Sequence, residues 1–383
     1  MLLTKGFEVE VYTGTPTGDV VGLSDRIVKE LPGFVREPDS RNVEYTTAPF
    51  CRYERLLCAL VQPRQRLRRY LQSLGGYTLI PGSTLALGGS DRFHRSDPAN
   101  PYHTYIERTY GTSVVTASIH INVGIADPEV LMRACRLVRV EAPLYLALSA
   151  ASPFVDGKPT GYHSTRWYTF PKTPAHVPLF ESHRHYIEWT EAQLAAGTMQ
   201  NVRHLWDSVR PNGDRRPYQL NRLELRICDL VTNPISLLAI TALLEARLMQ
   251  AIADPQLDPL QSSQLPSGSR ADDLVALTNE NERAAAAASL NATLRHWQNG
   301  QAITARDWIN ALYHQVWDTA KVAGISCFLL PVQQILKQGN EAQRWLTQYE
   351  HLGDARSVIQ EGIAEMARQE TALDDQLCHP LVA

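Results

Sequence analysis

Four short segments of this 383-residue chain alternate strictly between apolar and polar residues, and this period of two constrains the fold more than any other feature. They span residues 6–12, 41–47, 118–124 and 222–227. Alternation puts every second side chain on the same side of an extended strand. We therefore expect strands of an antiparallel sheet, with an apolar face packed on helices and a polar face left open.

The polar faces of these segments carry a set of side chains unusual for a solvated surface. Such a surface more often carries Lys, Ser, Thr and Gln than repeated carboxylates together with imidazole and guanidinium groups. Each row alone is still compatible with a solvated face, and the fourth also with a salt-bridge ladder. The polar rows are Glu8 and Glu10, then Asn42, Glu44 and Thr46, then Ser118, His120 and Asn122, and finally Arg222, Glu224 and Arg226.

This combination of side chains indicates nucleotide-phosphate chemistry. Mg²⁺ prefers oxygen ligands and commonly bridges protein carboxylates to phosphate oxygens. Arginine neutralises charge on a transferred phosphoryl group and grips carboxylates through its planar fork. The chain has neither a GxxxxGK[ST] loop nor a GxGxxG motif after a strand, so ATP is expected to bind by another arrangement.

The distribution of patterns along the chain predicts an α+β fold. Residues 1–235 hold the β-rich part with the active site, and residues 236–383 are mainly helical, so we expect one integrated catalytic domain over 1–383. Asn233 and Pro234 predict the start of a long buried helix, and Thr304 with Asp307 predicts another helix start. Residues 255–269 are expected to form an exposed loop.

Composition bears on partners and compartment. The formal net charge of -3 gives no positive field for nucleic acid, and the basic run 63–70 is interpreted as a solvated helix face. The most apolar stretch, 143–154, is too short to span a membrane, and the first residues lack a secretory signal, so we expect a cytoplasmic enzyme. Six scattered cysteines favour reduced thiols over a disulfide framework or a zinc site.

Taken in order, these segments resemble the glutamate–cysteine ligase family related to bacterial carboxylate–amine ligases, most closely its cyanobacterial branch. The similarity covers most of residues 1–235 and rests on the order and spacing of several short motifs. These motifs are Gly-Phe-Glu-Val-Glu at 6–10, Asn-Val-Glu-Tyr-Thr at 42–46, Ser-Ile-His-Ile-Asn-Val-Gly at 118–124, Gly-Tyr-His-Ser-Thr-Arg-Trp at 161–167 and Arg-Leu-Glu-Leu-Arg-Ile-Cys-Asp at 222–229.

The resemblance implies a glutamine-synthetase-like fold, an antiparallel sheet forming an active-site cleft with helices outside. It also implies ATP- and Mg²⁺-dependent joining of L-glutamate to L-cysteine through a γ-glutamyl phosphate, the first step of glutathione biosynthesis. Carried onto this sequence, the implied metal ligands are Glu8, Glu10, Glu44, His120 and Glu224. The implied phosphate-binding arginines are Arg226, Arg222 and Arg210, and the implied substrate-binding residues are Arg166, Asn122 and Thr46, with Glu224, Arg226 and Arg166 counted as catalytic.

Other functions stay open on the sequence alone. A related ligase with another amine acceptor would share the metal and phosphate machinery, and a catalytically silent nucleotide- or amino-acid-binding protein would share the fold. The sequence sets neither the oligomeric state nor the number of metal ions, and Glu37 and Asp39 are further carboxylates that the motifs do not align. Because Glu224 belongs to a polar face, Glu224→Ala is expected to abolish turnover and leave the fold largely intact.

Overall fold

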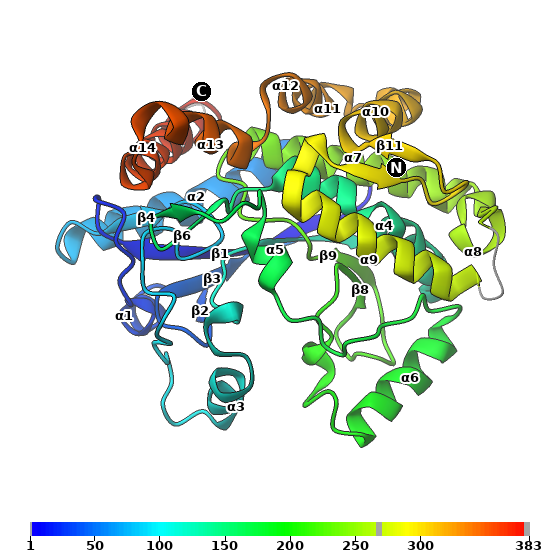
Figure 1. Cartoon of the computed structure of the whole chain (residues 1–383), viewed down its shortest axis with the longest axis horizontal. Coiled ribbons are helices and arrows are strands. Elements are labelled where there is room, and N and C mark those ends of the chain that lie inside the picture. Colours follow the sequence, from blue (N-terminus) through cyan, green and yellow to red (C-terminus); the bar gives the residue numbers. More distant parts are fainter. Residues whose placement is uncertain (1, 266–269, 379–383) are drawn as a thin grey trace, which may run out of the picture.

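The computed structural model of the chain describes residues 2–265 and 270–378. Its centre is an antiparallel sheet in the strand order β2-β3-β1-β5-β9-β8, with β4 paired to β1 (Figure 1). The strands are β1 (Lys5–Gly14), β2 (Phe34–Arg36), β3 (Asn42–Thr46), β4 (Thr78–Ile80), β5 (Ile119–Gly124), β8 (Val209–Asn212) and β9 (Arg222–Leu225).

The register of the sheet brings the polar rows together. Residues directly opposite one another on neighbouring strands point to the same face, so their side chains are neighbours. Each of the four segments predicted from alternation is a strand in this sheet, and the α+β prediction is confirmed. The opposed sets across the strands are Thr46–Glu8–His120, Glu44–Glu10 and Asn122–Glu224–Arg210.

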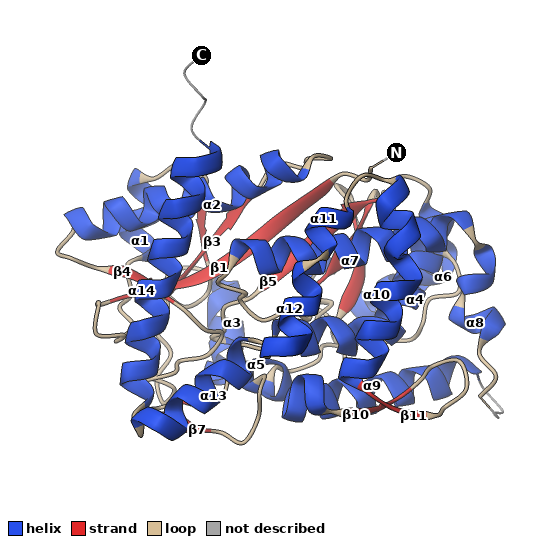
Figure 2. Cartoon of the chain, turned by 90° about the horizontal axis from the view of Figure 1, so that it is seen from above, coloured by secondary structure: helices blue, strands red, loops and turns tan. Residues whose placement is uncertain are grey.

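Helices cover the apolar face of the sheet, as both views show (Figures 1 and 2). Phe7, Val9 and Val11 of β1 are at most 1% exposed beneath them. Asn233 caps helix α7 (Pro234–Ala253) by accepting a hydrogen bond from the Ser236 amide at 2.9 Å, as the sequence predicts. The layer is built from α2 (Tyr53–Ser73), α4 (Pro128–Ser149), α7 (Pro234–Ala253), α9 (Arg270–Ala288), α10 (Ala305–Val322), α11 (Ser326–Leu329), α12 (Pro331–Gln338), α13 (Glu341–Leu352) and α14 (Ala355–Leu373).

Helix α7 is the core of this layer. By length and composition alone it passes the test for a membrane-spanning helix, but 72% of that stretch is buried inside the protein, where it packs on α2, α4 and α10. Its Glu245 is fully buried and pairs with Lys5 at 2.8 Å, at the start of β1. The same carboxylate accepts hydrogen bonds from the Leu3 amide and the Tyr53 hydroxyl. This buried ion pair fixes the strand that carries Glu8 and Glu10 to the helical layer.

The polar face is flanked by α3 and α6, which stand below the sheet in Figure 1. Both helices begin with a side-chain cap, at Asn100 and Ser182 respectively. The remaining short elements are α1 (Ser24–Glu30), α3 (Pro101–Tyr110), η1 (Gly111–Val114), β6 (Phe154–Val155), β7 (Lys158–Pro159), α5 (Thr165–Thr169), α6 (His183–Ala195), η2 (Val202–His204), η3 (Pro255–Leu257), α8 (Pro259–Ser262), η4 (Ser289–Asn291), β10 (Thr293–Arg295), β11 (Ala302–Thr304) and η5 (Asp374–Cys378).

Two predictions about the outer segments are wrong in part. The expected loop at 255–269 contains η3 and α8 because Asp254 and Asp258 each cap a turn that begins with proline, while its residues 266–269 lie outside the described part. The basic run 63–70 is not wholly solvated either. Arg64 and Arg68 are buried, since both pair with the buried Glu370 of α14.

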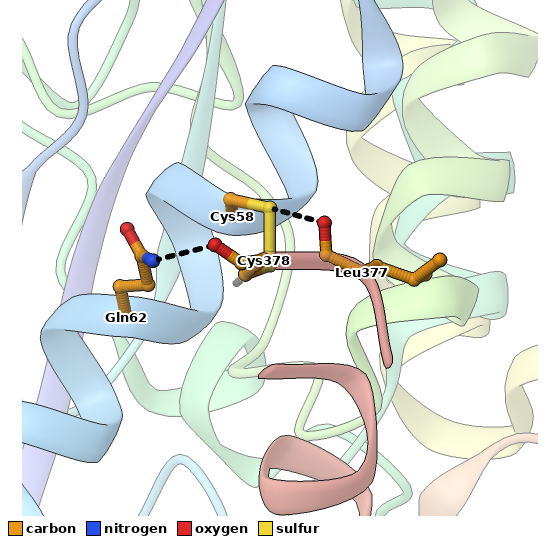
Figure 3. The surroundings of a disulfide bond; sticks show 4 residues. All are labelled: Cys58, Gln62, Leu377 and Cys378. Atoms are coloured by element: carbon orange, nitrogen blue, oxygen red, sulfur yellow. Dashed lines mark hydrogen bonds between the residues drawn. A yellow bond between two sulfur atoms is a disulfide. The ribbon is translucent and has the colours of Figure 1, made fainter. Parts of the chain in front are cut away.

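The expectation of reduced cysteines is wrong for one pair. Cys58 of α2 and Cys378 of η5 form a disulfide across a sequence separation of 320 residues (Figure 3). Gln62, one helical turn after Cys58, donates a hydrogen bond to the Cys378 carbonyl at 3.4 Å. Spacing along the chain carried no sign of this pairing because only the packing of η5 on α2 brings the two thiols together. Cys51, Cys135, Cys228 and Cys327 are free.

Candidate active site

Three adjoining cavities follow the polar face of the sheet. The first, of about 570 Å³, lies where β1 begins and β3 and β5 end, and we call it the strand-end cavity. The second, of about 630 Å³, is rich in arginine and is called the arginine cavity. The third, of about 450 Å³, is called the aromatic cavity because Tyr102, Trp167, Phe170 and Trp206 line it. Shared lining residues make the three a continuous trough with carboxylates at its centre.

A cluster of three carboxylates stands where the arginine and aromatic cavities meet. One oxygen each of Glu10, Glu37 and Glu44 lie within 4.8 Å of one another. Burial, together with the charges of Glu8 and Glu10, raises the pKa of Glu44 to about 8. Burial and the charges of Glu10 and Glu44 raise the pKa of Glu37 well above its ordinary value. Such mutual repulsion fits a set of oxygen ligands for a divalent cation.

A second possible ligand set is formed by Glu8, His120 and Glu224, again within 4.8 Å. His120 Nδ1 lies 3.0 Å from Glu8 Oε2, and its Nε2 lies 3.1 Å from the Ser118 hydroxyl. Burial opposes ionisation of Glu8, as does the charge of Glu224, but its contacts with His120 hold the pKa of Glu8 below its ordinary value. Both imidazole nitrogens therefore have partners within the sheet.

Glu224 is more deeply embedded than its polar row suggests. It is fully buried, and Arg210 grips it through Nε at 2.7 Å and Nη2 at 3.0 Å. Asn212 and Arg226 add hydrogen bonds at 2.7 and 2.5 Å. Although burial penalises its charge, Arg210 and Arg226 hold the pKa of Glu224 well below its ordinary value.

The environment of Glu224 changes two sequence expectations. Removing this carboxylate would leave buried guanidinium groups uncompensated, so the expectation that Glu224→Ala spares the fold is wrong in its premise. Most donors of Arg210 are also in use, because its Nη1 donates to the carbonyls of Arg203 and Leu205 while Nε and Nη2 donate to Glu224. Arg210 therefore holds Glu224 in place and does not present a free guanidinium group to phosphate.

Other arginines of the arginine cavity retain free donors. Arg226 reaches Glu224 and His120 through Nη1 alone. Arg222 lies at the junction with the strand-end cavity, where it contacts Asp214 and Asn221. Arg216 has a buried Nη1 without a hydrogen-bond partner among the described residues, and burial with the charge of Arg210 lowers the pKa of Arg216 to about 10. A guanidinium left partly unsatisfied beside carboxylates is suited to bind an anion such as phosphate.

Arg166 lies in the wall of the aromatic cavity, with most of its donors in use. It is 2% exposed, and its Nε donates to Asp229 at 3.0 Å. Its Nη2 donates to three backbone carbonyls at 226–228. Within the described part of the chain Nη1 makes no hydrogen bond, so it remains for a substrate carboxylate. Asn122 and Thr46, which share its predicted substrate-binding role, line the strand-end cavity instead, so the structure does not bring the three together.

Several residues of the trough carry no signal in the alternating segments. Glu37 follows the three-residue strand β2, Arg203 lies in the short helix η2, and Arg216 lies in the irregular segment after β8. They join the site only because the sheet order places β2 and β8 at opposite edges of the polar face. Glu37 is a carboxylate that the sequence motifs do not align, and neither arginine belongs to one of those motifs.

A family model and individual relatives relate the sequence of the chain to one enzyme family. The family model for glutamate-cysteine ligase family 2 (GCS2) matches residues 4–366. A relative from Rubrobacter xylanophilus, provisionally named glutamate–cysteine ligase 2-1, is 27% identical over 372 residues, covering 93% of each chain. A relative from Sorangium cellulosum, provisionally named glutamate–cysteine ligase 2, is 30% identical over 249 residues, covering 64% of this chain and 63% of its own.

Two solved structures share the fold over nearly the whole chain. The glutamate–cysteine ligase from Francisella tularensis, solved in complex with AMP, has a TM-score of 0.70 at 12% identity and covers 99% of this chain and 93% of its own. The bifunctional glutathione synthetase from Pasteurella multocida has a TM-score of 0.75 at 15% identity. It covers 98% of this chain, which in turn spans 53% of that longer enzyme.

Proposed function

The chain belongs to glutamate–cysteine ligase family 2, and on that premise we propose that it joins the γ-carboxylate of L-glutamate to the amine of L-cysteine at the expense of ATP. The observation that carries the proposal is the continuous trough, with clustered carboxylates beside arginines that retain free donors. A nucleotide, a phosphoryl group in transfer and an amino acid need adjoining sites of this kind. AMP in the structurally similar Francisella ligase supports an adenine nucleotide as one occupant.

Mg²⁺ fits the carboxylate cluster better than the second ligand set. Glu10, Glu37 and Glu44 offer oxygen ligands that repel one another in its absence. At the second set, Glu8 and His120 already contact each other, and Glu224 accepts four hydrogen bonds from Arg210, Asn212 and Arg226. Bound at the carboxylate cluster, Mg²⁺ would neutralise the phosphate oxygens and polarise the phosphoryl group toward attack.

The residues of the chain would then order the two chemical steps. The γ-carboxylate oxygen of glutamate attacks the terminal phosphorus of ATP, which yields γ-glutamyl phosphate and ADP. Arg226, fixed by Glu224 at 2.5 Å, and Arg216 would stabilise charge on the transferred group. The cysteine amine then attacks the acyl carbon and phosphate departs, forming the amide. Arg166 would hold a glutamate carboxylate through Nη1 in the aromatic cavity.

The direct test measures ADP release with ATP, Mg²⁺ and L-glutamate, with and without L-cysteine, and identifies the product by mass spectrometry. We expect turnover only when both amino acids are present, and a product with the mass of γ-glutamylcysteine. Arg216→Lys should lower kcat/KM because a single ammonium replaces a two-pronged donor. Exposed Arg184, which pairs with Glu188 on α6, provides the control as Arg184→Lys. An equal rate of ADP release with and without L-cysteine would refute cysteine as the acceptor.

A related carboxylate–amine ligase with a different acceptor is the second candidate. The metal and phosphate-binding residues would be common to both enzymes, and the aromatic cavity would receive another amine. Comparing ADP release with cysteine, other amino acids and simple amines separates the two functions. Faster turnover with an amine other than cysteine would favour this second candidate.

A further inference from the structure

One carboxylate of the aromatic cavity has no part in the chemistry described above. Asp207 lies between η2 and β8, and it lines this cavity next to Trp206. Its side chain is 1% exposed. Neither of its oxygens accepts a hydrogen bond from any residue in the described part of the chain. A buried carboxylate is normally well supplied with donors, so this one requires an explanation.

Two other buried acids, Asp229 and Asp258, have hydrogen-bond donors on both carboxylate oxygens. Asp229 accepts hydrogen bonds on both oxygens, from Arg166, two serine hydroxyls and the Ala151 amide. Asp258 is gripped by Nε and Nη2 of Arg136. Asp207 instead has Arg139 Nε at 3.0 Å, an ion-pair distance without hydrogen-bond geometry. The two other Arg139 nitrogens donate to the carbonyls of residues 177 and 178.

The surroundings of Asp207 suit an organic cation. Trp206 and Phe170 lie with ring centroids 5.3 Å apart in the same wall, and aromatic faces attract cations. Burial lowers the pKa of the neighbouring His204 to about 4, so that ring is neutral. A metal ion would need several oxygen ligands, and Asp207 belongs to neither carboxylate set found among the described residues.

The backbone next to Asp207 is also held in place before any substrate binds. The Trp206 amide donates to the Thr173 carbonyl at 2.7 Å, and the Thr173 amide donates back at 3.3 Å. Glu10 and Glu37, which line the same cavity, already belong to the carboxylate cluster. Asp207 is therefore the acid of the aromatic cavity that remains for a cationic group of the substrate.

We propose that Asp207 binds the ammonium group of an amino-acid substrate in the aromatic cavity. The inference rests on the proposed function, which places an amino acid in this cavity. That ammonium group has two sources with the same chemistry, the α-ammonium of the glutamate donor and the amine of the acceptor. In either case the carboxylate supplies the charge and the aromatic rings exclude water around it.

Asp207→Asn keeps the shape of the side chain and removes its charge, and the two sources predict different kinetics. If Asp207 holds the donor, the KM for L-glutamate rises at least about 30-fold and the preference for L-glutamate over glutarate, which lacks the ammonium group, falls equally. If it holds the acceptor, the KM for L-cysteine rises by that factor and the glutamate-to-glutarate preference is unchanged. Unchanged constants for both amino acids in a folded variant would overturn the proposal.

Controls separate binding from a structural role. Asp258→Asn removes another buried acid paired with an α4 arginine, outside the three cavities, so we expect lower stability and KM values within about 2-fold of wild type. If Asp207→Asn does not fold, the double variant Asp207→Asn with Arg139→Met removes both buried charges and is assayed in the same way. An inactive wild-type enzyme would refute the proposed function, whereas active wild type with unaltered variants refutes the inference alone.

Discussion

At the scale of single residues, Glu44 links the proposed metal site to the stability of the protein. Its pKa of about 8 in the folded chain exceeds the ordinary 4.5 of an unfolded chain, so the folded state holds the proton more tightly. The resulting stabilisation is complete below pH 4.5 and is lost as the pH rises to about 8. We therefore expect the metal-free protein to lose stability across this window. Urea unfolding in the presence of a chelator, at about pH 5 and about pH 8, measures the loss.

Glu44→Gln tests this assignment of the carboxylate cluster. The variant should lose less stability than wild type between those pH values, because one of the repelling charges is gone. Mg²⁺ should stabilise wild type at the higher pH and stabilise the variant much less. Glu188→Gln, on the exposed face of α6, should behave as wild type. Equal Mg²⁺ stabilisation of Glu44→Gln and wild type would contradict metal binding by Glu44.

Glu224 is expected to affect both the fold and turnover. Glu224→Ala leaves the buried Arg210 and the partly buried Arg226 without their shared counter-charge, which should cost about 3–5 kcal/mol in the free energy of unfolding. Glu224→Gln retains a hydrogen-bonding side chain and should cost less, while still losing the charge that positions Arg226. Denaturant unfolding and ADP-release assays on both variants measure the two effects. Wild-type stability in Glu224→Ala would show that the arginines find other partners.

At the scale of elements, the alternating pattern predicts the strands that carry the candidate site but not the residues that hold its side chains in place. The shared face of Glu8, Glu10 and His120 could be predicted because a period of two assigns each side chain to a face without knowledge of the fold. The contacts of Glu224 with Arg210 and Asn212 could not be predicted, because both residues lie on β8, a strand of four residues without a clear alternating pattern. Asp207 and Arg216 are further from prediction still, since their importance lies in missing hydrogen bonds that only packing reveals.

The ion pair between β1 and α7 supports a prediction about these two elements. Glu245→Gln leaves Lys5 buried without a counter-charge, so the free energy of unfolding should fall by about 3–5 kcal/mol. Combining it with Lys5→Met removes the stranded charge and should recover most of the loss. Chemical denaturation of the two variants compares them directly. A double variant no more stable than Glu245→Gln would mean that the hydrogen bonds from Leu3 and Tyr53 matter more than the charge.

At the scale of the whole molecule, the sheet separates the helical layer, which stabilises the fold, from the face that carries the candidate active site. The helical layer holds the long buried helices, and the open face holds the trough. The strands β1 and β5 carry both functions, with apolar side chains toward the helices and ionisable ones toward the trough. Destabilising changes in the helical layer should therefore alter unfolding before they alter KM values.

The disulfide between α2 and η5 joins the end of the described chain to this helical layer, on the side away from the trough. Because it closes a loop of more than 300 residues, Cys378→Ser should lower the free energy of unfolding by about 2–4 kcal/mol, while KM values stay close to wild type. Alkylation of the denatured wild-type protein should label four thiols before reduction and all six afterwards. Cys327→Ser, which removes an exposed free thiol, is the matched control and should unfold like wild type. Labelling of six thiols without reductant would show that Cys58 and Cys378 are unpaired in solution, and η5 would then be held to α2 by packing alone.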